Sequence, residues 1–196
     1  MPASAAPFAI LRFEKVKTLG DLASQQTHIH RYRDTPNATP SRRHLNRLIF
    51  GEHFAIKGVQ KRLDEVKASG QKVRTNSIPA IEVLLTASPQ FFEQASPDEV
   101  AEWVDANERF LVDSFGADNV VQVVLHMDES TPHIHAVVFP RTRDGRLSAK
   151  DILGGPPGLS EWQTKYAASI GKGLSRGKKK SRGRHEKIAH WYAEND

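Results

Sequence analysis

Three histidines and two carboxylates lie within the stretch His126-Met127-Asp128-Glu129-Ser130-Thr131-Pro132-His133-Ile134-His135. Apolar runs on both sides of this stretch are typical of β-strands. Alternate residues of a strand share a face, so His133 and His135 should project together. The segment 128–132, which contains Pro132, can fold the preceding run back as an antiparallel neighbour that carries His126. The stretch therefore predicts a β-hairpin with three imidazoles on one face.

Three imidazoles on neighbouring strands have the spacing of a metal site. Cross-strand partners lie about 4.5–5.5 Å apart, so His126, His133 and His135 can hold one divalent ion and leave positions open to a substrate. A solvated face that carries histidines by chance is the alternative. The nearby Glu129 favours a metal site over this alternative, because it could serve as a further ligand or as the partner of a ligand histidine. Neutral ring nitrogens suit several divalent ions, so the pattern does not name the native metal.

Patterns elsewhere in the chain predict both helices and strands. Ser96, followed by Pro97 and by Glu99, is typical of a capped helix start. The fold class that follows is α+β: a central antiparallel sheet with helices packed on one face and the histidines on the open face. The expected strands are 8–16, 78–86, 120–127 and 133–138, with a short return strand at 146–148. The expected helices are 22–31, 55–68, 97–115, 159–170 and 185–193, and 154–158 is expected to be a loop.

Length and composition bound the class of protein. A chain of 196 residues is of ordinary single-domain size. We expect one domain over 1–196, with 172–184 as a mobile basic segment before the last helix. Cysteine is absent, which excludes disulfides and thiolate metal sites. No apolar run is long enough to cross a membrane, and the first residues lack the pattern of a signal peptide. A cytoplasmic protein is therefore expected.

The charge distribution indicates a nucleic-acid partner. The net charge is +5, but 31–74 holds eleven Lys or Arg against four acids, and 172–187 holds eight against one. Between them, 88–130 carries ten acids and only Arg109 as a base. Basic stretches that meet on one face would bind a phosphate backbone. The expected phosphate contacts are Arg42, Arg43, Arg47, Arg74 and Lys150.

A metal with open positions beside a basic surface suggests phosphodiester chemistry, which needs a nucleophile from elsewhere in the chain. The segment 27–33 offers His28, His30 and Tyr32. Both histidine and tyrosine can attack phosphorus covalently. On a helix these three positions do not share a face, so only one of them should point at the metal. Arg31 would clamp the phosphate or stabilise the charged transition state.

Glu82 is unusual because it lies in the apolar strand expected at 78–86, where an unpaired carboxylate would be costly. One interpretation is an ion pair with a basic residue such as Arg74. The other is that Glu82 accepts a hydrogen bond from the nucleophile and orients it.

The stretch 126–135 resembles the HxDExTPHxH signature of plasmid mobilisation relaxases of the Mob/Pre (MobV) type, which belong to the HUH endonucleases. Weaker matches at 28–31, 40–46 and 144–150 spread the resemblance over most of the chain. It implies a two-layer HUH relaxase fold and an enzyme that uses a divalent metal such as Mn²⁺ or Mg²⁺. Such an enzyme nicks single-stranded or hairpin DNA at an origin of transfer.

The resemblance also implies a covalent adduct between the 5′-phosphate and His28, and it supports the orienting role of Glu82. A coupling protein is a further expected partner in conjugative mobilisation. His30 and Tyr32 remain alternatives to His28 as nucleophile. Three other functions also remain open: a HUH rolling-circle replication initiator, a hydrolase that uses metal-bound water, and a DNA-binding module with a structural metal.

Overall fold

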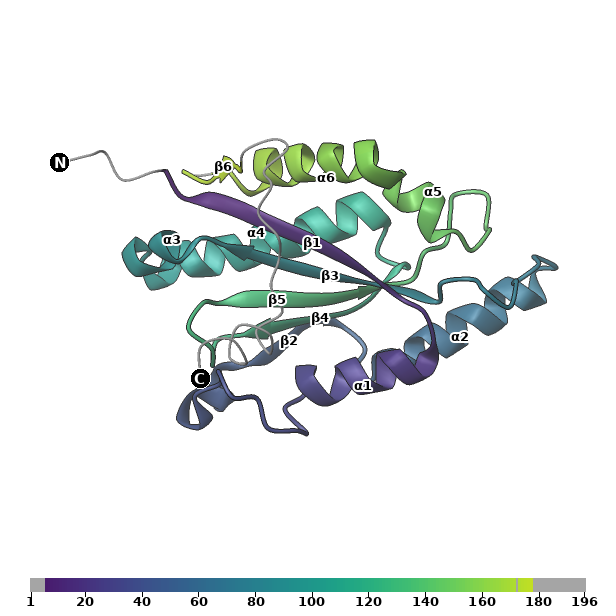
Figure 1. The fold of residues 1–196 in the computed structure, drawn as a ribbon, viewed down its shortest axis with the longest axis horizontal. Helices are drawn as coiled ribbons and strands as arrows, with labels where there is room; N and C mark the ends of the chain where they lie inside the picture. Colours follow the sequence, from purple (N-terminus) through teal and green to yellow (C-terminus); the bar gives the residue numbers. More distant parts are fainter. Residues whose placement is uncertain (1–5, 172, 178–196) are drawn as a thin grey trace, which may run out of the picture.

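One six-stranded sheet organises the chain (Figure 1). The structure, a computed structural model, describes residues 6–171 and 173–177. The strands lie in the order β2-β4-β5-β3-β1-β6, and all neighbours are antiparallel except β6, which pairs in parallel with β1. The predicted α+β class with a central antiparallel sheet is confirmed. The strands are β1 (Phe8–Val16), β2 (Arg47–Gly51), β3 (Ala80–Ala87), β4 (Val120–His126), β5 (His133–Val138) and β6 (Ser175–Arg176).

One face of the sheet packs against α4 (Pro97–Phe115) and α6 (Gly155–Ile170). Because side chains alternate along a strand, Ile81, Val83 and Leu85 of β3 all point into this layer and are fully buried there. The helix side of the layer is rich in aromatic rings that pack edge to face. Two short helices, α3 (Pro89–Gln94) and α5 (Ala149–Leu153), border the layer.

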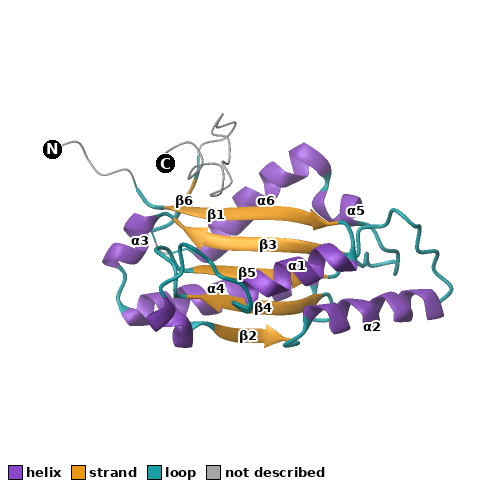
Figure 2. Ribbon diagram, turned by 60° about the horizontal axis from the view of Figure 1, so that its bottom comes forward, coloured by secondary structure: helices purple, strands orange, loops and turns teal. Residues whose placement is uncertain are grey.

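The opposite face is only partly covered (Figure 2). There α1 (Leu19–Ile29) and α2 (Ala55–Ala68) pack a second core onto the end of the sheet where β5 finishes, with Val137 fully buried in it. The turn between β4 and β5 lies at the other end, beside the 3₁₀ helix η1 (Pro40–Leu45). The prediction of one fully open face is therefore wrong in part, because two amphipathic helices cover the end of that face where β5 finishes.

The start of one helix, α4, is determined by the capping residues predicted from the sequence. The side chain of Ser96 accepts a hydrogen bond from the N–H of Glu99, and the carboxylate of Glu99 accepts one from the N–H of Ser96. This capping box starts α4, which ends at Gly116.

No helix in residues 6–171 and 173–177 is long and apolar enough to cross a membrane.

Other stretches differ from the prediction. The edge strand β2 was not expected, and the expected return strand at 146–148 is reduced to one bridge between Arg141 and Leu147. The expected loop at 154–158 forms the start of α6, because proline is tolerated in a first helical turn, where N–H groups lack intrahelical partners. Within the basic segment 172–184, two residues form β6. Residues 172 and 178–184, and the helix expected at 185–193, lie outside the described residues.

Candidate metal and catalytic centre

The β4–β5 hairpin brings three imidazole rings together. His126 at the end of β4 pairs directly with His133 at the start of β5, and His135 lies two residues further along β5. The ring centroids form a nearly equilateral triangle, with sides of 5.0 Å (His126–His133), 4.9 Å (His126–His135) and 5.0 Å (His133–His135). The register alone produces this convergence, because cross-strand pairs on one face of a hairpin are neighbours.

Each ring uses one nitrogen to anchor itself in the protein. The acceptors are two backbone carbonyls and one carboxylate. Nε2 of His126 donates to the carbonyl of Ile29 (2.9 Å), Nδ1 of His133 to that of Thr131 (2.9 Å), and Nδ1 of His135 to Oε1 of Glu82 (2.7 Å). Because these oxygens only accept, the ring proton faces them, and the lone pair stays on the other nitrogen of each ring.

The ligand atoms that lie within 4.8 Å of one another form two overlapping sets, His28–His126–His135 and His126–Glu129–His133. Nδ1 of His126 and Nε2 of His133 are 3.2 Å apart, and Nε2 of His135 is buried with no hydrogen-bond partner. Burial lowers the pKa of His126 to about 2 and that of His135 well below 6.5, and the neighbouring rings add to both effects. Imidazoles with a hydrogen-bond acceptor behind each ring are the type of donor that holds a divalent metal, so these residues fit such an ion.

Arg31 ties the hairpin turn to the end of α1. Its guanidinium is buried and bonds both carboxylate oxygens of Asp128, at 2.9 Å from Nε and 2.7 Å from Nη2. Nη2 also lies 2.7 Å from Oε1 of Glu129 and 3.0 Å from Nδ1 of His126. The backbone of Arg31 has φ +57°, a left-handed conformation that costs a non-glycine residue about 1 kcal/mol or more. The ion pairs offset that strain.

The centre holds more acid than base. One guanidinium, that of Arg31, faces the carboxylates of Asp128 and Glu129, and Glu82 adds a third carboxylate behind His135. Although burial alone would raise it, hydrogen bonds from Arg31 and Asn46 hold the pKa of Asp128 well below its ordinary value. Burial raises the pKa of Glu82, against opposing effects of neighbouring histidines. A divalent cation would balance the charge of these carboxylates.

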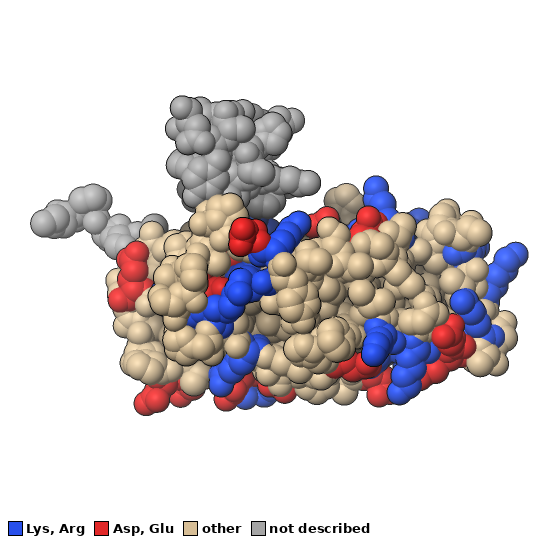
Figure 3. Space-filling model, turned by 90° about the horizontal axis from the view of Figure 1, so that it is seen from below, with Lys and Arg blue, Asp and Glu red and all other residues tan. Residues whose placement is uncertain are grey.

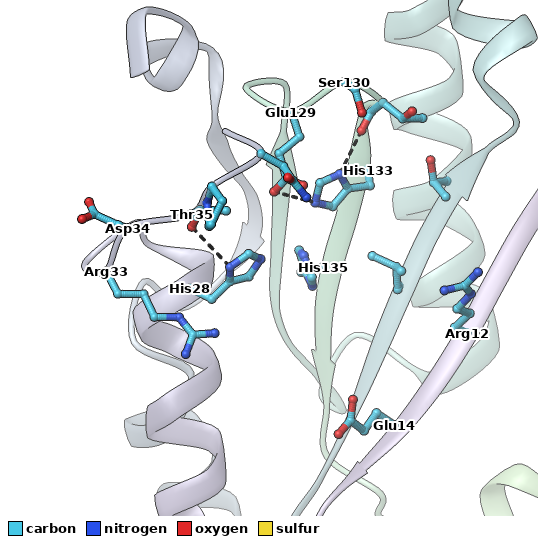
Figure 4. A pocket seen from close by; sticks show the side chains of 15 residues that line it. Arg12, Glu14, His28, Arg33, Asp34, Thr35, Glu129, Ser130, His133 and His135 are labelled. Carbon is cyan, nitrogen blue, oxygen red and sulfur yellow. Dashed lines mark hydrogen bonds and ion pairs between the residues drawn. The ribbon is translucent and has the colours of Figure 1, made fainter. Parts of the chain in front are cut away.

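A cleft of about 730 Å³ opens beside the triangle (Figure 4). His28, in the last turn of α1, projects into it, with its ring centroid 5.6 Å from His135 and 5.9 Å from His126. Nε2 of His28 lies 3.4 Å from Nη1 of Arg31, and Nδ1 lies 3.5 Å from Oγ1 of Thr35. Burial, followed by the charge of Arg31, lowers the pKa of His28, so its ring is neutral at pH 7.

The two alternatives to His28 lie outside this cleft. The ring of His30 is 4.7 Å from that of His53, and Tyr32 stacks on His30 at 5.5 Å. Neither His30 nor Tyr32 lines the cleft that His28 enters. His30 caps the C-terminus of α1, and two helical residues correspond to about 200° of rotation from His28. Tyr32 follows Arg31, whose φ of +57° lies outside helical geometry.

One carboxylate and one guanidinium have partners that differ from a sequence-based interpretation, whereas a second carboxylate does not. Glu82 is hydrogen-bonded to His135 and does not pair with Arg74, so the suggested ion pair is wrong, and its role on the nucleophile stays a prediction. Arg31 does not stand free to clamp a phosphate, because its guanidinium is committed to Asp128 and Glu129. Glu129 lies 3.7 Å from Nε2 of His133 and lines the cleft, a position compatible with either role suggested for it.

The expected phosphate contacts fall into two groups. Arg42 and Arg43 on η1 and Arg47 on β2 are exposed near the hairpin turn, and Arg43 donates to the carbonyl of Arg31 (3.0 Å). The second group, Arg74 before β3 and Lys150 in α5, lies at the other end of the sheet.

Some residues of the cleft were not singled out from the sequence. They include Arg12 and Glu14 of β1 and Thr35 of the loop that follows α1. The two β1 residues alternate with the core-facing Leu11 and Phe13, so their shared polar face was a readable signal. Thr35 lies in an irregular loop and had no such signal.

Comparison with known proteins places the chain among plasmid enzymes. The model of the family described as plasmid recombination enzyme (Mob_Pre) matches residues 5–193. A 65 kDa protein of Zymomonas mobilis subsp. mobilis is 37% identical over 188 residues, covering 94% of this chain and 32% of that protein. A type 3 plasmid recombination enzyme of Staphylococcus aureus is 29% identical over 194 residues, covering 94% of this chain and 47% of that enzyme. The chain thus spans about a third to a half of the length of these relatives.

A solved structure matches the fold over nearly the whole chain. It is the Mn-bound MobM relaxase domain (MOBV; Mob_Pre) in complex with 22 nucleotides of plasmid pMV158 oriT DNA. The TM-score is 0.85 at 25% identity, with 95% of this chain and 99% of that domain covered. The predicted relaxase-like fold is confirmed, and with the family match over 5–193 it follows that the chain belongs to the Mob_Pre family of plasmid recombination enzymes.

Proposed function

We propose that this chain is a metal-dependent DNA-nicking domain, which cuts one strand at a plasmid origin of transfer and retains the 5′-phosphate on His28. The observation that carries the proposal is the convergence of three imidazole rings beside a cleft into which His28 projects. The similar MobM domain binds oriT DNA and Mn, which supports both the substrate and the ion.

In this proposal His126, His133 and His135 hold the metal, and Glu129 lies beside it as a further ligand or as a partner of His133. A bound divalent cation, Mn²⁺ or Mg²⁺, would supply positive charge that polarises the scissile phosphate and stabilises its transition state. Glu82 is a positioning residue, because its hydrogen bond fixes the ring of His135 and leaves Nε2 without another hydrogen-bond partner.

His28 is the proposed nucleophile. A ring nitrogen must be unprotonated to attack phosphorus, and the lowered pKa keeps it so at neutral pH. The nitrogen lone pair forms the bond to phosphorus as the bond from phosphorus to the 3′ oxygen breaks. The 3′ oxygen takes up a proton and becomes a hydroxyl, and the phosphorylated ring loses its proton to solvent. The adduct can rejoin the strand by the reverse reaction without a nucleotide cofactor.

Arg31 acts through other residues in this scheme. It fixes Asp128 and Glu129 of the turn between the ligand histidines, and its Nη1 contacts His28 at 3.4 Å. The same side chain therefore sets the position of the ligand-bearing turn and of the nucleophile, which makes it a positioning residue.

The surface proposed to bind DNA phosphates consists of Arg42, Arg43 and Arg47, which lie near the centre and are exposed. Arg74 and Lys150 would contact only DNA that extends along the sheet, over the roughly 20 Å of a six-residue strand. The proposed compartment is the cytoplasm, where plasmid DNA is processed, and a coupling protein is a further proposed partner.

A supercoiled plasmid carrying the cognate origin tests the proposal. With Mn²⁺, we expect open circles with protein bound to the 5′ end, and chelation of the metal should leave the plasmid closed. Free 5′ ends would indicate a hydrolase that uses water, and closed circles with bound protein would indicate a DNA-binding module. A nick confined to a replication origin would indicate an initiator. Any of these three results contradicts the proposal.

Mass spectrometry of the adduct tests the assignment of the nucleophile. We expect the nucleotide on His28, and His28→Ala should form no adduct. The matched control is His44→Ala, which removes an exposed histidine from η1 and should react like the parent chain. A nucleotide mapped to His30 or Tyr32 would overturn the assignment.

A further inference from the structure

Exposed apolar side chains are concentrated in one region of the described surface. Of six large hydrophobic residues that are well exposed there, four lie between the end of α1 and the start of α2. They are Tyr32 (65% exposed), Phe54 (49%), Leu45 (41%) and Leu48 (40%). Single exposed apolar residues are common on proteins, but a cluster of them marks a binding surface.

Four rings in this region form a continuous aromatic platform, made of His30, Tyr32, His53 and Phe54. His30 stacks on Tyr32 at 5.5 Å with 27° between the planes, and it lies 4.7 Å from His53. His53 in turn contacts Phe54 edge to face at 4.7 Å. A hollow of about 210 Å³ beside the platform is lined by His30, His53 and Leu48 and also by Arg43 and Arg47.

A buried polar network holds the platform in place. Gln122, fully buried in β4, accepts a hydrogen bond from the side-chain amide of Gln26 (2.9 Å) and donates to the carbonyl of His53 (2.7 Å). Oε1 of Gln26 lies 3.1 Å from Nε2 of His30. The ring of His30 and the backbone at His53 are therefore preorganised. The metal centre uses neither glutamine.

Positive charges border the platform. Arg43 and Arg47 line the hollow, and Nζ of Lys57 lies 5.5 Å above the ring of Phe54. On the face that carries α1 and α2, Lys and Arg side chains lie both in the left half and at the right end (Figure 3). Glu52 next to the platform is paired with Arg62 at 2.9 Å. The surroundings therefore suit an anionic partner.

We propose that the aromatic platform stacks unpaired bases of the DNA strand whose phosphate is cut in the neighbouring cleft. The inference deepens the proposed function and rests on it. Aromatic rings accept any base, because every base presents a π-face, and basic side chains at the edge pair with the phosphates. His28 and His30 project from opposite sides of the end of α1, so the strand passes around that helix end between the cleft and the platform.

The charges mark the path of the strand at both ends. Arg33 lines the cleft, and Arg43 lines the hollow beside the platform. Arg43 also donates to the carbonyl of Arg31, which lies between the two sites. Phosphates between the scissile position and the stacked bases therefore meet basic side chains.

Fluorescence anisotropy with metal chelated tests the platform separately from catalysis. The probes are a fluorescein-labelled 20-nucleotide oligo-dT and an abasic strand of the same length. The double variant Tyr32→Ala/Phe54→Ala should bind oligo-dT about tenfold more weakly, which corresponds to the loss of one or two stacked bases. Tyr32→Phe should bind like the parent chain. The matched control Leu159→Ala, which removes an exposed residue of α6 (39%), should also be unchanged.

The abasic strand distinguishes stacking from a general defect. Without bases there is nothing to stack, so the double variant and the parent chain should bind this strand equally. An equal loss on both probes, or no loss on either, would overturn the inference. So would a change in self-association with unchanged DNA affinity, which would make the platform a protein interface. A parent chain that fails to nick DNA but shows the platform effect contradicts the proposed function alone.

Discussion

Replacing Glu82 with Gln should weaken the affinity for Mn²⁺ while the fold stays intact. Oε1 of Glu82 accepts the N–H of His135 at 2.7 Å, and the two side chains are only 13% and 10% exposed. Gln keeps the volume and the acceptor oxygen but removes the charge. A hydrogen bond to a charged group contributes about 1.5–3 kcal/mol and one to a neutral group about 0.5–1.5 kcal/mol. The difference of roughly 1–1.5 kcal/mol corresponds to nearly tenfold weaker binding.

Isothermal titration calorimetry with Mn²⁺ measures this effect directly. Glu14→Gln is the matched control, because Glu14 faces Glu82 across the β1–β3 pair and lines the same cleft, whereas it is Glu82 that His135 bonds. We expect the control to bind Mn²⁺ within about twofold of the parent chain. Removal of both charge and acceptor in Glu82→Ala should approach the roughly 100-fold upper range for residues behind a metal ligand.

Nicking assays complete the test. If Glu82 acts through the metal, excess Mn²⁺ should restore nicking by Glu82→Gln. Equal Mn²⁺ affinity in the variant and the parent chain would refute the reasoning. A nicking defect that excess Mn²⁺ does not restore would also refute it, and would return Glu82 to a role on the nucleophile.

Three further predictions concern stability and DNA binding. Asp128→Ala leaves the guanidinium of Arg31 buried with only Glu129 as a carboxylate partner, so urea unfolding should show a loss of about 3 kcal/mol; an unchanged midpoint would contradict this. The pKa of His126 is lowered to about 2 in the folded protein, so below pH 6.5 the unfolded chain binds more protons than the folded one. The free energy of unfolding of the metal-free protein should therefore fall by about 2 kcal/mol between pH 6.5 and 5 in denaturant titrations. A free energy of unfolding that does not change with pH would refute this prediction. Replacing Arg42, Arg43 and Arg47 with Ala should reduce the salt slope of single-strand binding by about 0.7 per lost phosphate contact; an unchanged slope would exclude these contacts.

The sequence was sufficient for the parts of the fold that local rules determine. Alternation in 126–135 predicted the hairpin and the meeting of three rings, because two strands joined by a short turn are neighbours in space. The capping box at Ser96 and Glu99 likewise predicted the start of α4. In both cases the information lies within a few consecutive residues.

The partners of the charged residues could not be predicted from local rules. Glu82 meets His135 because β3 lies beside β5, with Leu84 opposite His135, and nothing in either segment specifies that neighbour. The edge strand β2 depends in the same way on β4. The sequence around Arg31 does not indicate whether its guanidinium is buried or exposed. That depends on where the fold places Asp128 of the hairpin turn.

Two of the three anchors behind the histidine rings are main-chain oxygens, those of Ile29 and Thr131. Side-chain substitution cannot remove these two hydrogen bonds, because their acceptors are backbone carbonyls. Of the three anchors, a mutational scan can therefore remove only Glu82. Ile29 follows His28 directly in the chain, so its carbonyl links the proposed metal ligand His126 to the proposed nucleophile through the main chain. Ile29 is itself buried, so another apolar side chain that fills the same space would keep that coupling.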